Sequence, residues 1–238
     1  MTVILLRHGR STSNTAHTLA GRTDGIDLDD KGREQAQAVV ERLAGLPIRA
    51  IVRSPLLRCR RTVEPLAAAL GLDPLIDERI SEVDYGSWTG RKIGDLVKEP
   101  LWVVVQQQPS AAVFPCGEGL AYVQSRAVAA VREHDRRLAE LHEGDALWVA
   151  CTHGDVIKAV VADALGTHLD SFQRITTDPA SMSVIRYTAL RPFVIHVNHT
   201  GAALTAGLQA KPPKVDGEAD NKDGEVPPED AVVGGSTD

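Results

Sequence analysis

The sequence has few aromatic residues, few cysteines and no long hydrophobic run. Phe, Trp and Tyr make up 4% of the 238 residues, so the hydrophobic core must be mainly aliphatic. The densest apolar runs, at 101–105 and 146–151, are far shorter than the ~18 residues of a membrane helix, which excludes a membrane span. Cys59, Cys116 and Cys151 are odd in number and lack metal-binding spacing. Because the N-terminus also lacks the pattern of a signal peptide, we expect reduced thiols and a cytoplasmic protein.

Charge is modest and unevenly distributed. The formal net charge is −6, and Lys211–Asp238 holds eight acidic and three basic residues, so the rest of the chain is close to neutral. No basic stripe with interleaved aromatic residues is present, which argues against a nucleic-acid partner. The C-terminal segment is rich in Pro and Gly and has few large apolar residues. We therefore expect an acidic, disordered tail over 206–238 behind one domain over 1–205.

Short apolar runs alternate with segments of helical periodicity. Strands are predicted at 2–6, 49–53, 145–151, 182–187 and 193–197, and helices at 30–43, 56–70, 118–141 and from about 154 to 165. This alternation predicts an α/β fold, a three-layer sandwich with a mostly parallel central sheet flanked by helices. The stretch at about 90–115 has scattered prolines and fits neither pattern. It is predicted to be a lid-like insertion.

Two histidines directly follow predicted strands, and a glycine follows each of them. His8 comes after the first strand and His153 after the strand at 145–151. In open α/β sheets the functional crevice lies beyond the carboxyl ends of the strands, so both imidazoles are expected to face one crevice. The glycines are expected to let the backbone approach a ligand closely. A single histidine at such a position is more often structural, but the pair indicates a functional site.

Two arginines and one carboxylate extend this candidate site. Arg7 ends an apolar strand and Arg58 begins a helix, and a guanidinium presents a planar set of donors that suits phosphate oxygens. Asn14 could add an amide donor, although asparagine in a polar loop usually serves turn formation. Glu82 lies among apolar and aromatic residues that would raise its pKa by desolvation, and it could then act as a general acid. A solvated loop acid is the alternative for Glu82.

Four other charged or titratable residues are expected to be solvated. Arg60 and Arg61 are interpreted as surface residues, and His134 and His142 as part of the solvated face of a long helix. None of the histidines has zinc-binding spacing, so no metal is expected.

Taken in order, these motifs resemble the histidine phosphatase superfamily in its phosphoglycerate-mutase-like branch. The resemblance covers roughly residues 1–200, and the ordered set is far more specific than Arg-His-Gly alone. The matching segments are Leu6–Asn14, Gly21–Asp24, Ser54–Arg58 with Thr62, Glu82–Gly90, Pro115–Glu118 with Arg126, and Thr152–Gly154.

The resemblance implies a role for each candidate residue. It makes His8 the nucleophile that forms a phosphohistidine, and Glu82 the acid that protonates the leaving oxygen and then helps to activate water. His153, Arg7 and Arg58 would surround the transferring phosphoryl group. The residues that would bind phosphate are Arg7, Asn14, Gly21, Arg58, His153 and Gly154. No cofactor is implied, because guanidinium groups supply the positive charge that phosphoryl transfer needs.

Phosphatases and mutases share this kind of pocket, so its surroundings must decide between them. Mutases of this type resemble one another in a basic insertion, whereas 90–115 offers only Arg91, Lys92 and Lys98. We therefore expect a phosphomonoesterase with an acidic pH optimum, acting on a small phosphorylated metabolite. A phosphomutase and a regulatory binding protein of the same fold are the alternatives, and a homo-oligomer is possible. Asp155 follows His153-Gly154 and either faces the pocket mouth, where it would repel a substrate carboxylate, or stabilises a helix N-terminus.

Overall fold

The computed structural model describes residues 1–142 and 146–201. Its centre is a six-stranded sheet with the strand order β3-β2-β4-β1-β5-β6. β1 pairs with β4, β4 with β2, and β2 with β3 in parallel, whereas β5 and β6 are antiparallel additions at one edge. The strands are β1 Thr2–Arg7, β2 Ile48–Arg53, β3 Leu75–Ile76, β4 Leu147–Thr152, β5 Met182–Tyr187 and β6 Pro192–His199.

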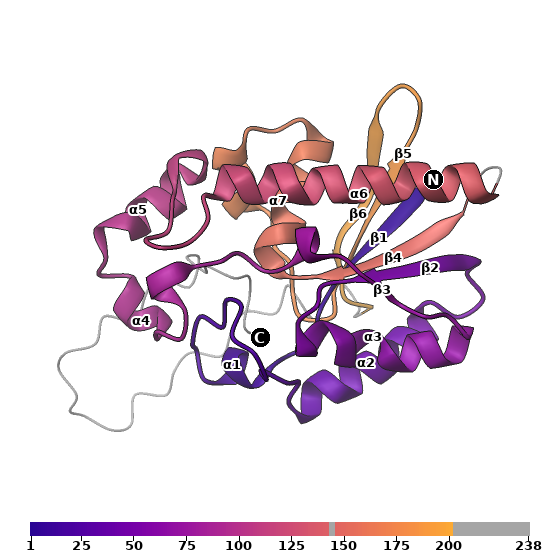
Figure 1. The fold of residues 1–238 in the computed structure, drawn as a ribbon, viewed down its shortest axis with the longest axis horizontal. Helices are drawn as coiled ribbons and strands as arrows, with labels where there is room; N and C mark the ends of the chain where they lie inside the picture. Colours follow the sequence, from indigo (N-terminus) through magenta and orange to yellow (C-terminus); the bar gives the residue numbers. More distant parts are fainter. Residues whose placement is uncertain (143–145, 202–238) are drawn as a thin grey trace, which may run out of the picture.

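Helices cover both faces of the sheet. α2 (Asp30–Arg42) packs against α3 (Leu57–Leu70) on one face, and the long α6 (Leu120–His142) packs against α7 (Gly154–Leu165) on the other (Figure 1). The predicted α/β sandwich with its mostly parallel sheet is confirmed. The remaining helices are α1 Thr12–Thr15, α4 Ile93–Leu96, α5 Pro100–Gln107 and four 3-10 helices, Glu78–Ile80, Gly86–Trp88, Pro109–Ala111 and Leu169–Arg174.

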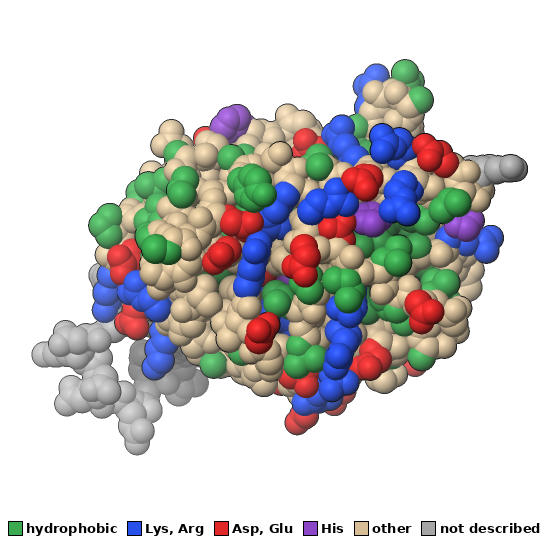
Figure 2. Space-filling model, in the orientation of Figure 1, with side chains coloured by type: hydrophobic (Ala, Val, Ile, Leu, Met, Phe, Trp, Pro, Cys, Tyr) green, Lys and Arg blue, Asp and Glu red, His purple; other side chains and the backbone are tan. Residues whose placement is uncertain are grey.

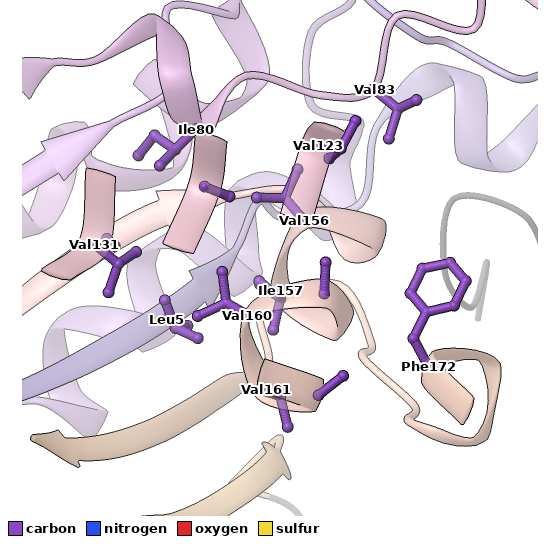
Figure 3. Packing of buried hydrophobic residues seen from close by; sticks show 14 of the residues in the cluster. Leu5, Ile80, Val83, Val123, Val131, Val156, Ile157, Val160, Val161 and Phe172 are labelled. Atoms are coloured by element: carbon purple, nitrogen blue, oxygen red, sulfur yellow. The ribbon is translucent and has the colours of Figure 1, made fainter. Parts of the chain in front are cut away.

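Alternation along β1 explains how the three layers hold together. Leu5 belongs to the cluster between the sheet and α6 and α7, where Val131 and Val160 also lie (Figure 3). Ile4 and Leu6 belong to the cluster on the α2 and α3 side. Because successive side chains of a strand point to opposite faces, one continuous apolar run fills both layers, as is typical of a buried parallel strand.

The stretch at 90–115, predicted to be an insertion, contains two helices that periodicity did not predict. α4 and α5 lie beyond the carboxyl ends of the parallel strands (Figure 1). Trp102 of α5 is buried and stacks on Trp88, with ring centroids 6.2 Å apart. The run Val103 to Val105 favours a strand locally, so the packing of Trp102 and Val105 into the core outweighs this preference.

One predicted surface residue is in fact buried. His134 on α6 is 8% exposed, and its Nε2 lies 2.8 Å from Oδ2 of Asp77, just after β3. The prediction of a solvated His134 was wrong because this turn of α6 faces the sheet; His142 at the end of α6 is exposed.

Two sequence predictions concern the limits of the described chain. No helix within residues 1–142 and 146–201 is long and apolar enough to cross a bilayer. The predicted tail, 206–238, and the last residues of the predicted domain lie outside the described residues.

Candidate active site

The candidate site forms where three adjacent parallel strands end. His8 directly follows β1, His153 follows β4 and caps the N-terminus of α7, and Arg58 lies in the first turn of α3 after β2. Because β2, β4 and β1 are neighbours and run parallel, their carboxyl ends meet at one edge of the sheet. Glu82 reaches the same place from the loop after the 3-10 helix Glu78–Ile80.

His8 is held as a neutral imidazole whose Nε2 is unprotonated. Its Nδ1 is 2.7 Å from the carbonyl oxygen of Gly9, so Nδ1 must carry the proton and donate. Nε2 therefore accepts, and Nε of Arg58 donates to it over 3.3 Å. Burial, followed by the positive charges of Arg58 and Arg7, holds the pKa of His8 well below its usual value. The unprotonated Nε2 of the ring faces Arg58.

Gly9 is required by close packing. Its backbone passes so near α2 that an added Cβ would lie 2.7 Å from the carbonyl oxygen of Gly32. The structure therefore shows close approach between two backbone segments at Gly9, and approach to a ligand stays a prediction. Its N–H also donates to Oγ1 of Thr62 over 2.9 Å, and the Thr62 hydroxyl donates to the carbonyl oxygen of Arg58 over 2.7 Å. Thr62 therefore ties the His8 loop to the helix that carries Arg58.

His153 is the second buried imidazole. Nη2 of Arg58 donates to its Nδ1 over 3.2 Å, so the proton lies on Nε2, which contacts Oγ of Ser54 at 2.8 Å. The two imidazole rings have centroids 5.2 Å apart. Burial and the charge of Arg58 hold the pKa of His153 well below its usual value. His8 and His153 are thus both neutral without a bound anion.

The arginines concentrate positive charge at the edge of the sheet. Arg58 is 1% exposed and also donates from Nη2 to the carbonyl oxygen of Gly21 over 2.9 Å. Among the described residues its buried Nη1 has no hydrogen-bond partner. Arg7, equally buried, donates from Nη1 to the carbonyl oxygen of Thr177 over 2.7 Å. A buried donor without a partner costs free energy, and an anionic oxygen would satisfy it.

Glu82 is a buried acid, which excludes the solvated alternative. It is 5% exposed, and its Oε2 lies 3.7 Å from Nδ1 of His153. Burial and the negative charge of Asp155 raise its pKa to about 7, against the opposing charge of Arg58. Its backbone carbonyl accepts from Nε of Arg22 over 2.8 Å. Glu82 is therefore fixed in place and can hold a proton near neutral pH.

The remaining predicted residues lie around this group. Gly21 contributes its carbonyl oxygen to Arg58, and Gly154 begins α7 directly after His153. Asn14 completes the capping box of α1, whose N-cap residue is Ser11, and its Oδ1 accepts from the backbone N–H and hydroxyl of Ser11 at 2.9 and 2.8 Å. This role in turn formation matches the alternative given for Asn14. Because Oδ1 of Asn14 faces Ser11, the amide N–H groups of Asn14 point away from Ser11.

Asp155 does not stand at a pocket mouth. It is 1% exposed, and its Oδ2 accepts from the hydroxyl of Tyr85 over 2.8 Å. Its Oδ1 lies 3.5 Å from Nζ of the buried Lys158. The expected repulsion of a substrate carboxylate therefore has no basis in the structure. Asp155 acts instead on Glu82 and Arg7, as one of the charges that raise the pKa of each.

Sequence reasoning missed the supports of the site. Ser54 and Tyr85 were noticed only as members of motifs, and Lys158 was not noticed at all. Their partners are 99, 70 and 3 residues away in the chain, respectively. Only the Asp155 to Lys158 spacing on one helix face was available as a signal.

The geometry suits transfer of a phosphoryl group. A neutral imidazole nucleophile, two buried guanidinium groups and a protonated carboxyl meet at one point, which provides attack, charge stabilisation and a proton. Within the described residues no group of three or more His, Cys, Asp or Glu side chains could hold a metal ion.

Comparison with known proteins decides the family. The model of the histidine phosphatase superfamily (branch 1) matches residues 3–200. The chain belongs to this superfamily. Among its relatives, phosphoserine phosphatase 1 of Hydrogenobacter thermophilus is 29% identical over 203 residues, which are 83% of this chain and 92% of the relative. A probable phosphoglycerate mutase, GpmB, of Salmonella choleraesuis is 31% identical over 188 residues, or 78% and 84% of the two chains.

Solved structures agree with this assignment to the histidine phosphatases. A mycobacterial glucosyl-3-phosphoglycerate phosphatase in complex with VO3 superposes with a TM-score of 0.76 at 25% identity, covering 83% of this chain and 99% of the other. YhfR of Bacillus stearothermophilus gives a TM-score of 0.75 at 27% identity, with 83% and 96% covered. The predicted family and the predicted enzyme class, a phosphatase, are confirmed.

Proposed function

We propose that this histidine phosphatase is a phosphomonoesterase that works through a phosphohistidine on His8, with Glu82 as general acid and base. The observation that carries the proposal is the state of these two side chains. His8 presents the lone pair of Nε2, because Nδ1 is committed to the carbonyl of Gly9. Glu82, with its pKa raised to about 7, holds the proton that a leaving oxygen requires.

In the first step Nε2 of His8 attacks phosphorus and the bond from phosphorus to the leaving oxygen breaks. The carboxyl proton of Glu82 passes to that oxygen, so the leaving group departs as a neutral alcohol. Negative charge on the phosphoryl oxygens is stabilised by Arg7 and by Arg58, whose buried Nη1 has no protein acceptor among the described residues.

In the second step a water oxygen attacks phosphorus and the bond from phosphorus to Nε2 breaks. The Glu82 carboxylate, left by the first step, takes a proton from the water. Inorganic phosphate leaves, and both His8 and Glu82 return to their starting protonation states. Splitting the transfer into two displacements lowers the barrier of each.

A phosphatase is favoured over a mutase by the surroundings of the site. Arg91, one of the three basic residues in the 90–115 stretch, is already bound to Glu99 over 2.7 Å. A regulatory protein without activity has no need of a complete set of His8, Arg7, Arg58, Glu82 and His153. The substrate that we propose is a small phosphorylated metabolite. The cytoplasmic location and the homo-oligomer stay predictions.

The test is phosphate release from a panel of phosphomonoesters, with the phosphoenzyme trapped by rapid quenching. We expect His8→Ala to abolish release and trapping, and the trapped phosphate to be labile in acid but stable in alkali. His142→Ala is the matched control, because His142 is exposed at the end of α6. Turnover by His8→Ala at the wild-type rate would overturn the proposal.

Glu82→Gln separates the acid role from binding. We expect it to slow hydrolysis of alkyl phosphates by about 100-fold or more. The loss with p-nitrophenyl phosphate should be smaller, because p-nitrophenolate leaves without a proton. Equal losses on both substrates would contradict the role of Glu82 as general acid.

A further inference from the structure

The backbone around Glu82 is held by side chains from outside its own loop. Residues 81–88, here called the acid loop, contain one short 3-10 helix, Gly86–Trp88, and no strand. In Figure 1 the purple segment that contains this loop runs between α6 and α3, and Figure 2 shows acidic and basic side chains intermixed over the same part of that face. The polar groups of the loop backbone therefore need partners from other segments.

Two guanidinium groups bind the backbone carbonyl of Glu82. Nε of Arg22 donates to this oxygen over 2.8 Å, and Nη2 of Arg126 donates to it over 3.2 Å. Arg22 directly follows Gly21, whereas Arg126 is buried on the second turn of α6. One carbonyl oxygen is therefore fixed by charge-assisted hydrogen bonds from two segments that lie far apart in the chain.

A single carboxylate, that of Glu118, holds both arginines. Its Oε1 lies 2.9 Å from Nη2 of Arg22 and accepts from Nε of Arg126 over 3.0 Å. Its Oε2 accepts from Nη2 of Arg126 over 2.9 Å and from the N–H of Asp84 over 3.0 Å. Burial alone would raise the pKa of Glu118, but the hydrogen bonds from Arg126 and Asp84 hold that pKa below its usual value. Glu118 is thus ionised across the pH range in which Glu82 titrates.

The turn that carries Glu118 is packed directly against the acid loop. A Cβ added at Gly117 would overlap the carbonyl oxygen of Asp84, and one added at Gly86 would overlap that of Pro115. The N–H of Glu118 donates to the carbonyl oxygen of Asp84 over 2.8 Å. Two glycines on facing segments thus allow the close approach that brings the Glu118 carboxylate to the loop.

The carboxyl group of Glu82 depends on this backbone for its position. Within residues 1–142 and 146–201, its one hydrogen-bond donor is the N–H of Val83, the next residue, over 2.9 Å. Nδ1 of His153 and Nη2 of Arg58 lie 3.7 and 4.0 Å from Oε2 of Glu82, beyond hydrogen-bond distance. Because the anchor of the carboxyl group is a peptide of its own loop, a shift of the loop would carry the acid away from the leaving oxygen.

From this arrangement we infer that Glu118 is a positioning residue for the general acid, and that it acts by holding Arg22 and Arg126 on the carbonyl oxygen of Glu82. The inference rests on the proposed phosphomonoesterase function. Glu118 then contributes to the two steps in which Glu82 moves a proton. Attack by His8 on a substrate whose leaving group needs no proton is independent of Glu118.

The test compares Glu118→Gln with the wild type on two aryl phosphates that differ in one nitro group. Phenolate is far more basic than p-nitrophenolate, so release of phenol needs the proton of Glu82 and release of p-nitrophenol does not. The first turnover is measured by rapid quenching at saturating substrate, which reports only the transfer to His8. We expect Glu118→Gln to slow the first turnover of phenyl phosphate about tenfold and that of p-nitrophenyl phosphate less than about twofold.

Breakdown of the phosphoenzyme gives a second readout. Because Glu82 also takes a proton from the attacking water, the phosphoenzyme of Glu118→Gln should hydrolyse about tenfold more slowly than that of the wild type, whichever substrate formed it. Breakdown at the wild-type rate would overturn the inference. Equal losses on the two aryl phosphates in the first turnover, as expected from a variant that is only less stable, would also overturn it.

Glu133→Gln is the matched control, because it removes the same charge from a carboxylate that binds close to the acid loop. Glu133 lies on α6 and accepts from Nη1 of Arg79 over 2.7 Å, and in the described chain it has no hydrogen bond or ion pair with Arg22 or Arg126. It should leave the ratio of the two first-turnover rates unchanged. If Glu118→Gln does not fold, Arg22→Met removes one of the two donors to the Glu82 carbonyl and should lower the rate on phenyl phosphate alone by about threefold.

The double variant Glu82→Gln/Glu118→Gln tests whether Glu118 acts through Glu82. Adding Glu118→Gln to Glu82→Gln should not change the ratio of the two first-turnover rates any further, and a further change would overturn the inference. The single variants separate the two proposals. A selective loss on phenyl phosphate in Glu82→Gln but not in Glu118→Gln would overturn only the role of Glu118, whereas equal losses on both substrates in Glu82→Gln would overturn the general-acid role itself.

Discussion

At the scale of single residues, burial and the negative charge of the neighbouring Asp155 explain how Glu82, an acid next to two arginines, keeps its proton. Arg58 and Arg7 both favour the charged form of Glu82, and burial together with the charge of Asp155 outweighs them. The pKa of Glu82 is thereby raised to about 7, whereas that of His8 lies well below its usual value. These are the protonation states that the proposed mechanism requires, with Glu82 as proton donor and His8 as nucleophile.

This balance predicts the pH dependence of turnover. In the proposed mechanism the active form has neutral His8 and protonated Glu82, so kcat should be highest on the acidic side of neutrality and should fall as the pH rises through about 7. In Asp155→Asn the pKa of Glu82 falls, because a negative charge that raised it is removed. The descending limb of the pH profile should therefore move to lower pH.

Asp163→Asn is the control for this shift, because Asp163 lies on the same helix and is bound to Arg132 over 2.8 Å, away from the site. An Asp155→Asn profile that coincides with the wild type would show that Asp155 does not act on Glu82.

At the scale of elements, α5 is fixed by one large side chain. Trp102 is buried and stacks on Trp88, which in turn meets Phe114 edge-on at 5.3 Å between ring centroids. These three rings join the 90–115 stretch to the loop that follows Glu82. With so few aromatic residues in the chain, this cluster is the main aromatic part of the core.

Truncation of this side chain should be costly. Trp102→Ala should lower the free energy of unfolding by about 3–5 kcal/mol, the range for large buried aromatic residues. Val103→Ala on the same helix should change it by less than about 0.5 kcal/mol, because Val103 is 55% exposed. Urea unfolding of both variants measures the difference, and equal effects would mean that α5 does not depend on its buried face.

The elements also show what a single sequence can predict. Strands and helices with strong periodicity, such as β1 and α6, were predicted from the sequence with limits close to those in the structure. β3 was missed because it has two residues, both exposed, and therefore no alternation to detect. α5 was missed because its helical state depends on partners elsewhere in the chain, not on the local preference of three valines.

At the scale of the whole molecule, folding brings uncharged histidines into the interior. Unfolding returns them to water, where they bind protons below about pH 6.5, as does any histidine with its usual pKa. The folded state therefore binds fewer protons on His8 and His153 than the unfolded state does. Glu82 has the opposite effect, because its raised pKa makes the folded state hold one proton more.

Because the two histidines bind protons only in the unfolded state and one carboxyl binds a proton only in the folded state, acidification lowers the stability of the folded protein. Between the usual pKa values of Glu and His, 4.5 and 6.5, the free energy of unfolding should fall by up to about 1.4 kcal/mol per pH unit as the pH decreases. Urea unfolding at several pH values measures this slope. His8→Gln should reduce it and His142→Gln should not, and a stability that rises towards acid would contradict the prediction.

The residues that meet in the candidate site were predictable as a set, but the network of contacts around them was not. His8, Arg7, Arg58, Glu82 and His153 follow from ordered motifs and from the rule that strand ends meet at one edge. What those residues touch was not predictable, because the partners of His153 and Asp155 come from other elements. The burial of Asp155, and with it the loss of the expected repulsion, depends on that network.

Cys116 has a practical consequence that follows from its position. It is exposed, whereas Cys59 and Cys151 are buried, and burial raises the pKa of the Cys151 thiol well above its usual value. A maleimide dye should therefore attach at one place in the unmodified protein. Cys116 lies in a turn beside Pro115, whose carbonyl oxygen accepts from the N–H of Ser87 over 2.9 Å. Ser87 belongs to the same loop as Glu82. The native sequence thus supplies a fluorescent reporter position for watching the acid loop during turnover.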